Sequence, residues 1–202
     1  MHIFYHPDYD IPVQSTHRFV GTKFSDLYNH LQIQPFASKL KVGQPTAAPM
    51  ERITRAHSST YIKKVSRDEL SKDDLRLINL PWSKRLRDRS FLAIEGTYQT
   101  ARQALKSGIA CHVGGGTHHA HRDHGLGFCV FNDLGYAAKN LISEGRFNYS
   151  KDIKNSDIEN LGAKFHGYIN YDKKNDYFVN SDTVSSKIKN FIGYFLHGVK
   201  LK

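Results

Sequence analysis

The chain has 202 residues, of which 39% are hydrophobic and 24% are charged. These fractions are typical of a globular protein with one sizeable core, and they exclude a chain that is disordered throughout. There is no run of about 18 apolar residues, and the N-terminus MHIFYHPDYD lacks the charged and apolar regions of a secretory signal. We therefore expect a soluble protein that stays in the cytoplasm.

The formal net charge is +10. A basic balance favours acidic partners such as nucleic acids, but the basic residues of this chain are scattered along the sequence. One denser group is interrupted by Asp88 and fits the solvated face of a helix; it consists of Lys84, Arg85, Arg87 and Arg89. Nucleic-acid binding is therefore the function with the least support.

The first predicted element in chain order is a short strand at Ile3, Phe4 and Tyr5, which Pro7 ends. A helix is expected from Thr22 to Gln34, because apolar residues recur there at helical spacing; they are Phe24, Leu27, Tyr28 and Leu31. The stretch GQPTAAP, residues 43–49, has the composition of a loop. Ile53 is then assigned to a second strand.

Three helices are predicted next. His57-Ser58-Ser59 offers a cap for a short helix that buries Tyr61, Ile62 and Val65, and Ser71 with Asp73 and Asp74 begins another, which ends before Pro81. The third is long, from about Ser83 or Asp88 to Lys106, with Gly108 placed as its C-terminal cap. Its expected apolar side carries Phe91, Ile94, Tyr98, Ala101 and Leu105.

A strand over residues 109–113 and a helix over residues 133–143 follow. The alternation of helix and strand predicts an α/β fold with a mostly parallel sheet. Functional sites of such sheets lie at the carboxyl ends of the strands. The strand at 109–113 leads into Gly114, Gly115 and Gly116 and then into the adjacent pair His118 and His119. Glycines allow close backbone approach and histidines transfer protons near neutral pH, so we interpret this segment as an active site.

The motifs GGGTHHA and GLGFCVFNDLGYAA resemble the tandem-histidine and glycine-phenylalanine segments of the zinc-dependent histone deacetylase family, in its bacterial and class IV-like branch. FYHPDYDIPVQSTHRF and ITRAHSSTYIKKV are similar to earlier segments of that family, so the resemblance covers roughly the first three quarters of the chain. It implies a three-layer α/β sandwich with a mostly parallel sheet, of the arginase and deacetylase type.

The resemblance also implies roles for four residues. His118 and His119 would be the base that takes the proton of a zinc-bound water and the partner that stabilises and then protonates the leaving amine. Gly127 and Phe128 would provide the backbone carbonyl and the aromatic wall of an acyl-lysine channel. The implied cofactor is Zn²⁺, and the implied substrate is an acylated lysine or a related small acyl-amide.

Other histidines near this segment receive structural assignments. His112 is expected to be a satisfied core histidine in its strand, and His121 and His124 are expected to face solvent at the pocket mouth. His6, Pro7 and Tyr9 are placed near the rim.

The composition changes after Arg146. Residues 1–146 contain 11 Arg, 9 Lys and 4 Asn, whereas residues 147–202 contain no Arg, 9 Lys and 7 Asn. We therefore divide the chain into a deacetylase-like portion, residues 1–146, and a divergent Lys/Asn-rich tail, residues 147–202. The Asp-x-His pair that supplies the family's first metal ligands does not occur in that tail, so the sequence predicts an incomplete sheet and no tight zinc site. His166, Asp172 and Asp176 are the chemically suitable replacements.

Two main hypotheses follow from this combination of motif and missing ligands. One is a deacetylase-family hydrolase of acyl-amides, truncated or frame-shifted and impaired in activity. The other is a non-catalytic deacetylase-like binding module or remnant. Hydrolysis of a slow amide needs the metal as an electrophile, since proton transfer alone contributes only about 10²–10⁴-fold.

Overall fold

The computed structural model describes residues 1–146, 170–172 and 177–179. Two short strands of the tail, β4 (Asn170–Asp172) and β5 (Tyr177–Val179), pair antiparallel. The remaining residues of 147–202, including a helix that the apolar spacing predicts from Val184 to Leu196, lie outside the described residues.

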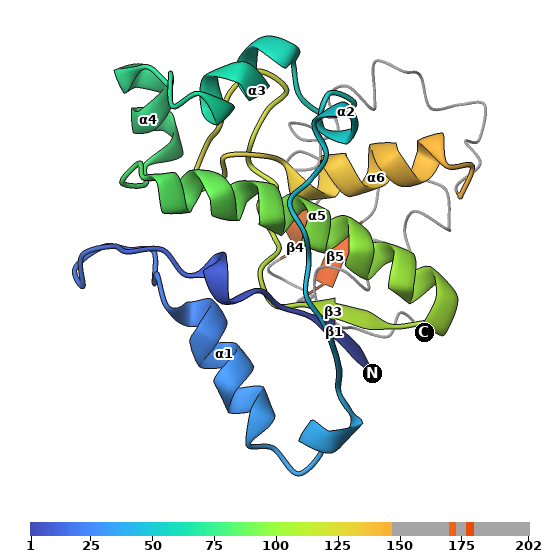
Figure 1. The fold of residues 1–202 in the computed structure, drawn as a ribbon. Coiled ribbons are helices and arrows are strands. Elements are labelled where there is room, and N and C mark those ends of the chain that lie inside the picture. The colour runs from blue at the N-terminus through green and yellow to red at the C-terminus, as the bar shows by residue number, and fades with distance from the viewer. Residues whose placement is uncertain (147–169, 173–176, 180–202) are drawn as a thin grey trace.

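A small parallel sheet lies at the base of residues 1–146 (Figure 1). Its strands are β1 (His2–Phe4), β2 (Lys41–Gly43) and β3 (Ala110–His112), and β1 lies between the other two. Ile3 of β1 is opposite Val42 on one side and Cys111 on the other. All three strands point the same way, so their carboxyl ends meet at one edge, as predicted.

Residues 1–146 also form six helices and two short 3₁₀ turns. The helices are α1 (Lys23–Gln32), α2 (Met50–Ile53), α3 (Ser59–Ser66), α4 (Lys72–Ile78), α5 (Lys84–Ser107) and α6 (Asp133–Ser143), and the turns are η1 (Pro7–Tyr9) and η2 (Ala37–Lys39). In Figure 1, α5 runs along the strands with α6 beyond it, while α1 lies on the other side. This confirms the mixed α/β class and the parallel sheet.

Polar caps begin the helices where the sequence indicates them. The Ser58 hydroxyl accepts a hydrogen bond from Tyr61 N–H at the start of α3, and Ser83 does the same for Leu86 N–H at the start of α5. Ser71 and Asp74 form a reciprocal capping box at the start of α4. Gly108 ends α5 at a φ of 79°, a conformation that favours glycine.

Helix α5 forms the centre of the core. Leu86, Ile94, Tyr98 and Ala101 are fully or almost fully buried, and α6 packs along the same helix through residues such as Tyr136 and Leu141. Tyr61, Ile62 and Val65 of α3 are buried as well, as predicted. The core therefore lies where α3, α5 and α6 meet, next to the sheet rather than inside it.

Several expectations were wrong in detail. Ile53 ends helix α2 and belongs to no strand; the strand in that region is β2, ten residues earlier. Leu27 and Leu105 are 47% and 45% exposed, so the apolar faces of α1 and α5 are narrower than the spacing indicates. Tyr9 is completely buried rather than at the rim.

The basic group on α5 also differs from its prediction. Arg89 is buried, and its Nε donates a hydrogen bond of 2.7 Å to the carbonyl of Tyr9. Burial lowers the pKa of Arg89 to about 10. Arg85 remains exposed and forms a 2.7 Å ion pair with Asp8. Two members of this group therefore hold the N-terminal segment, and only part of the group faces solvent as predicted.

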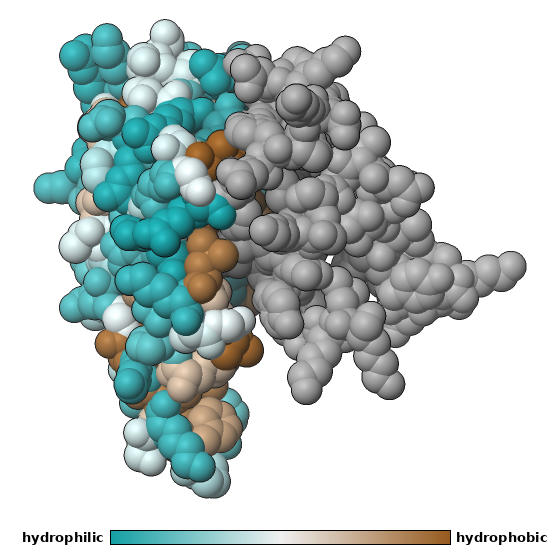
Figure 2. Space-filling view, turned by 90° about the vertical axis from the view of Figure 1, so that its right-hand side faces the viewer, coloured by the Kyte–Doolittle hydropathy of each residue, from teal (hydrophilic) through white to brown (hydrophobic). Residues whose placement is uncertain are grey.

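The face of the described part in Figure 2 is mainly hydrophilic, with hydrophobic side chains gathered along one border. Two of the exposed apolar residues belong to or flank the sheet, Val42 at 47% and Ile109 at 51% exposure. Among the helices that the structure describes, none is long and apolar enough to cross a bilayer.

We predict that Ile94→Ala lowers the free energy of unfolding by about 2–5 kcal/mol, because it leaves a cavity at a site that is 1% exposed. Leu105→Ala, in the same helix, is the matched control and should change stability by about 1 kcal/mol or less. Urea unfolding followed by circular dichroism measures both, and equal losses would contradict this position of the core.

Candidate functional site

A loop that leaves the carboxyl end of β3 carries the candidate site. It spans residues 114–124, and we call it the histidine loop. Gly116 has a φ of 97°, which favours glycine, and its N–H donates a hydrogen bond of 2.6 Å to the buried carboxylate of Asp133. The turn after the strand is therefore fixed by a residue from the start of α6.

A chain of hydrogen bonds lies beneath this loop. The Tyr9 hydroxyl lies 2.7 Å from His112 Nε2, the other ring nitrogen lies 2.9 Å from Thr97 Oγ1, and Thr97 donates to Asp133 Oδ2 at 2.7 Å. Because the Thr97 proton goes to Asp133, its oxygen must accept from His112 Nδ1–H. His112 Nε2 then accepts from Tyr9, so every proton in the chain points towards Asp133.

Burial fixes the protonation state of this chain. It lowers the pKa of His112 to about 3 and raises that of Tyr9 far above its usual value, so His112 is neutral and Tyr9 keeps its proton. His112 is thus a satisfied core histidine, as expected. The packing is also tight, since a Cβ on Gly115 would lie 2.6 Å from His112 Nδ1 and 2.9 Å from Thr97 Oγ1.

Asn132 connects the histidine loop to the first turn of α6. Its Oδ1 accepts a hydrogen bond of 2.7 Å from Gly135 N–H and so caps the helix, as the sequence indicates. Its Nδ2 donates to the carbonyls of His118, at 3.0 Å, and Ala120, at 2.9 Å. One amide group therefore caps α6 and holds the backbone on both sides of His119.

His57 holds the same segment from another direction. Its Nε2 accepts a hydrogen bond of 2.9 Å from Asn132 N–H, and its ring is 1% exposed. Burial lowers the pKa of His57 to about 4. The next residue along, Ser58, donates its N–H to the carbonyl of Arg122 at 2.8 Å, so the start of α3 is joined to the end of the histidine loop.

The structure brings the four predicted site residues together. The rings of His118 and His119 have their centroids 4.3 Å apart. A Cβ added to Gly127 would lie 3.5 Å from the ring of His119, so the glycine packs directly against that imidazole. Phe128 follows at a φ of 69°, an unusual value for a non-glycine residue, of the kind that gathers at functional sites.

The ring of His118 has a defined orientation. Its Nδ1 lies 2.9 Å from the carbonyl oxygen of Gly116. Since a carbonyl only accepts, Nδ1 carries the hydrogen and Nε2 is the basic nitrogen. Gly116 thus contacts Asp133 through its N–H and His118 through its carbonyl, so a single residue connects the buried carboxylate to the imidazole.

The remaining nearby groups lie apart from this arrangement. His121 and His124 stack on each other at 4.5 Å and are both partly exposed. Cys129 is buried, and burial raises the pKa of its thiol to about 12, so it is a poor nucleophile near neutral pH.

Comparison with known proteins agrees with this geometry. Residues 17–150 match the model of the histone deacetylase domain. The chain belongs to the histone deacetylase family. The resemblance carried by the glycine and histidine motifs is therefore confirmed, and β2, β3 and the histidine loop lie inside the matched region.

Individual relatives of this deacetylase-family chain match over part of its length. An uncharacterised protein of Picosynechococcus sp. is 36% identical over 143 residues, which is 71% of this chain and 48% of that protein. The acetoin utilization protein AcuC of Staphylococcus aureus is 29% identical over 115 residues, 52% of this chain and 29% of AcuC. Histone deacetylase 8 of Xenopus tropicalis is 29% identical over 126 residues, 56% of this chain and 34% of that protein. The matched region thus spans about half, or less, of each relative.

The family's zinc requirement does not fit the residues in view. In the part of the chain that the structure describes, no group of three or more His, Cys, Asp and Glu side chains is placed to hold a metal ion. His166 and Asp176 lie outside the described residues, and Asp172 is described only as a backbone position in β4. The described histidine loop therefore offers imidazole side chains that are not joined into a group of three or more potential metal ligands among the described residues.

We predict that Asn132→Asp lowers the free energy of unfolding by about 2–4 kcal/mol. The carboxylate can still cap α6, but it places a buried negative charge against the carbonyls of His118 and Ala120. Ser83→Asp is the control, because it changes the cap of α5 to an equally good one next to Lys84 and should alter stability by at most about 0.5 kcal/mol. Urea unfolding distinguishes the two, and a neutral Asn132→Asp would contradict the double role of Asn132.

Stability should fall as the pH is lowered from about 6.5 towards 4. The pKa of His57 is about 6.5 in the unfolded chain and about 4 in the folded protein. As the pH falls, the unfolded state therefore binds the proton at a higher pH and is stabilised relative to the folded state. The group should account for about 2 kcal/mol between pH 7 and pH 5. His112, whose pKa burial lowers to about 3, contributes a similar fall over the same pH range. His57→Gln should therefore remove about half of the fall in the urea-unfolding profile, whereas His30→Gln, on the exposed side of α1, should leave it as in the parent chain.

Proposed function

We propose that this chain recognises an acylated amine, with acyl-lysine as the leading candidate, and supplies the general base of a deacetylase-type hydrolase. The observation that supports this best is the oriented His118. Its Nδ1–H donates to Gly116 and its Nε2 is basic, in the loop at the sheet edge where the family resemblance expects the site.

The proton chemistry follows from the two histidines. His118 Nε2 can accept a proton from an attacking water, and a positioned base of this kind contributes roughly 10²–10⁴-fold to a rate. His119, whose ring lies 4.3 Å from that of His118, is proposed to stabilise and then protonate the leaving amine. The backbone groups that hold both residues keep the rings in place during the transfer.

Recognition is proposed to involve Gly127 and Phe128. The Gly127 carbonyl accepts a weak 3.5 Å contact from the Cys129 thiol and keeps a second lone pair, which suits the N–H of an acyl-amide. The Phe128 ring offers an apolar wall for the alkyl part of a lysine. Phe128 is held by its own N–H, which donates 2.8 Å to the carbonyl of Ile78. Such a wall keeps its position whether or not a ligand is present.

A zinc ion, where bound, would polarise the acyl carbonyl and activate water. The described residues do not hold such an ion, so this chain's own part in the proposal is limited to binding and proton transfer. A second candidate function, a non-catalytic acyl-lysine binding module, is favoured by the absence of an Asp-x-His pair from the sequence of residues 147–202.

Two measurements on the purified chain, prepared without chelator, test the proposal. Zinc content is determined by elemental analysis, and hydrolysis of an acetyl-lysine peptide is followed together with His118→Ala and His30→Ala. A hydrolase should show turnover that His118→Ala reduces by at least about 10²-fold and that His30→Ala leaves unchanged.

The outcomes separate the two functions. One zinc per chain with turnover that depends on His118 supports the enzyme and indicates ligands beyond the described residues. Binding of the acetylated peptide without turnover supports the binding module. Equal affinity for acetylated and unacetylated peptides would overturn both.

A further inference from the structure

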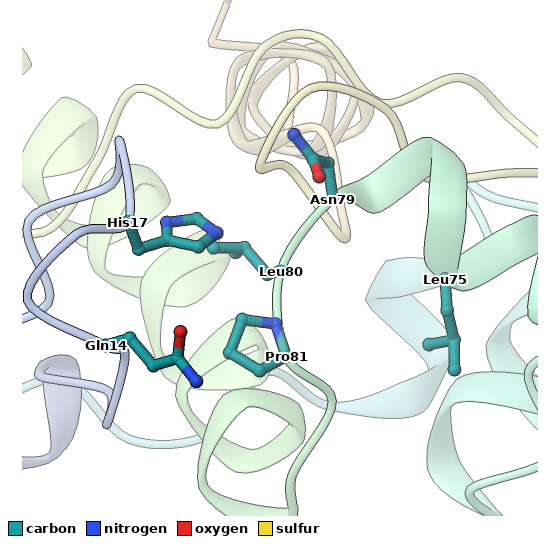
Figure 3. Close-up of a pocket in the computed structure, with 6 residues that line it drawn as sticks. All are labelled: Gln14, His17, Leu75, Asn79, Leu80 and Pro81. Carbon is teal, nitrogen blue, oxygen red and sulfur yellow. The ribbon is translucent and has the colours of Figure 1, made fainter.

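A pocket of about 360 Å³ opens beside the candidate site. Its walls come from two segments, the loop between η1 and α1, and helix α4 with the connection from α4 to α5. We call it the rim pocket, and it is lined by Gln14, His17, Leu75, Asn79, Leu80 and Pro81. Figure 3 shows Gln14 and His17 across the space from Leu80 and Pro81. Its volume is at the lower end of the roughly 300–1,000 Å³ of ligand pockets.

The segment that lines the rim pocket is hydrogen-bonded to the backbone of the proposed acyl channel. Gly127 N–H donates 3.0 Å to the carbonyl of Leu77, and Phe128 N–H donates to Ile78. From the other wall, the His17 ring meets the Phe128 ring edge-on with centroids 5.8 Å apart. A ligand that occupies the acyl channel against Phe128 therefore has its outer part next to the rim pocket.

The polar groups of the pocket suit a peptide backbone. His17 Nδ1 accepts a hydrogen bond of 2.9 Å from Phe19 N–H, so the neutral ring carries its hydrogen on Nε2 and offers a donor. Among the described residues, the side-chain amides of Gln14 and Asn79 form no hydrogen bond with the protein, and each offers a donor and an acceptor. A peptide group has the complementary pair.

The rest of the lining selects an apolar side chain. Leu75, Leu80 and Pro81 form an apolar surface, and none of the six lining residues carries a carboxylate or an ammonium group. A charged ligand group would lose hydration there without gaining an ion-pair partner of opposite charge. The wall is also preset, since Asn79 holds a φ of 55° at the end of α4 and Pro81 restricts the chain that follows.

We propose that the rim pocket binds an apolar residue adjacent to the acylated lysine of a polypeptide substrate. This inference rests on the proposed function and refines it, because it selects a peptide or protein rather than a small acyl-amide. The pocket supplies hydrogen bonds to the substrate backbone and an apolar surface for the neighbouring side chain, while the acylated lysine lies against Phe128.

The test uses four peptides and the full chain. The peptides carry either acetyl-lysine or lysine, flanked on both sides by either Leu or Asn, which are similar in size and uncharged. Affinities are measured by isothermal titration calorimetry. For acetylated peptides, Leu flanks should improve Kd by about tenfold or more over Asn flanks.

Matched variants locate the effect. Leu75→Asn should reduce the preference for Leu flanks to about threefold or less, whereas Leu77→Asn should preserve it, because Leu77 is 42% exposed in the same helix and does not line the pocket. Gln14→Trp fills the pocket from an exposed loop position and should also abolish the preference. The Gln14→Trp variant therefore tests the same preference if Leu75→Asn fails to fold.

The results distinguish this inference from the function on which it rests. If acetylation raises affinity but the flanks have no effect, the rim pocket assignment is wrong and the proposed function stands. If the flanks matter but acetylation does not, the pocket binds peptides and the acyl-lysine function falls. An equal loss of preference in Leu75→Asn and Leu77→Asn would also overturn the pocket.

Discussion

The histidine loop depends on two adjacent residues at the start of α6. Asn132 holds the loop backbone on both sides of His119, and Asp133 holds the N–H of Gly116 at the turn after β3. Both side chains are buried, where a hydrogen bond is stronger than in water and an unmade one is costly. Thr97 of α5 donates a hydrogen bond to Asp133, and His57, just before α3, accepts one from the Asn132 N–H. These two contacts connect the pair to the rest of the core.

This arrangement places two pairs of histidines in different surroundings. His57 is buried and His112 is partly buried; both are neutral, and they serve as hydrogen-bonding parts of the frame. His118 and His119 are partly exposed and lie on the loop that the frame holds. Because burial removes the charge from the first pair, a proton taken up at the site is not shared with the core beneath it.

The elements with local signals could be predicted from the sequence. Ser58, Ser71, Ser83 and Gly108 mark helix ends by their own chemistry, and the four site residues stand in a recognisable motif. Ile53 was misassigned because four residues of helix after a Pro-rich loop have no period to detect. Arg89 was misassigned because only the fold brings the Tyr9 carbonyl to it. Thr97 and Asp133 lie 36 residues apart, and no spacing rule connects them.

The acceptor for His118 is a main-chain carbonyl rather than a side chain. A carboxylate in that place could be lost by a single codon change, whereas the Gly116 carbonyl is present whatever residue occupies the position. Sequence changes around the site can therefore alter the orientation of the His118 ring only by moving the backbone, and the turn of Gly116 with its contact to Asp133 resists such movement. The orientation of this imidazole can thus persist among relatives that share few side chains.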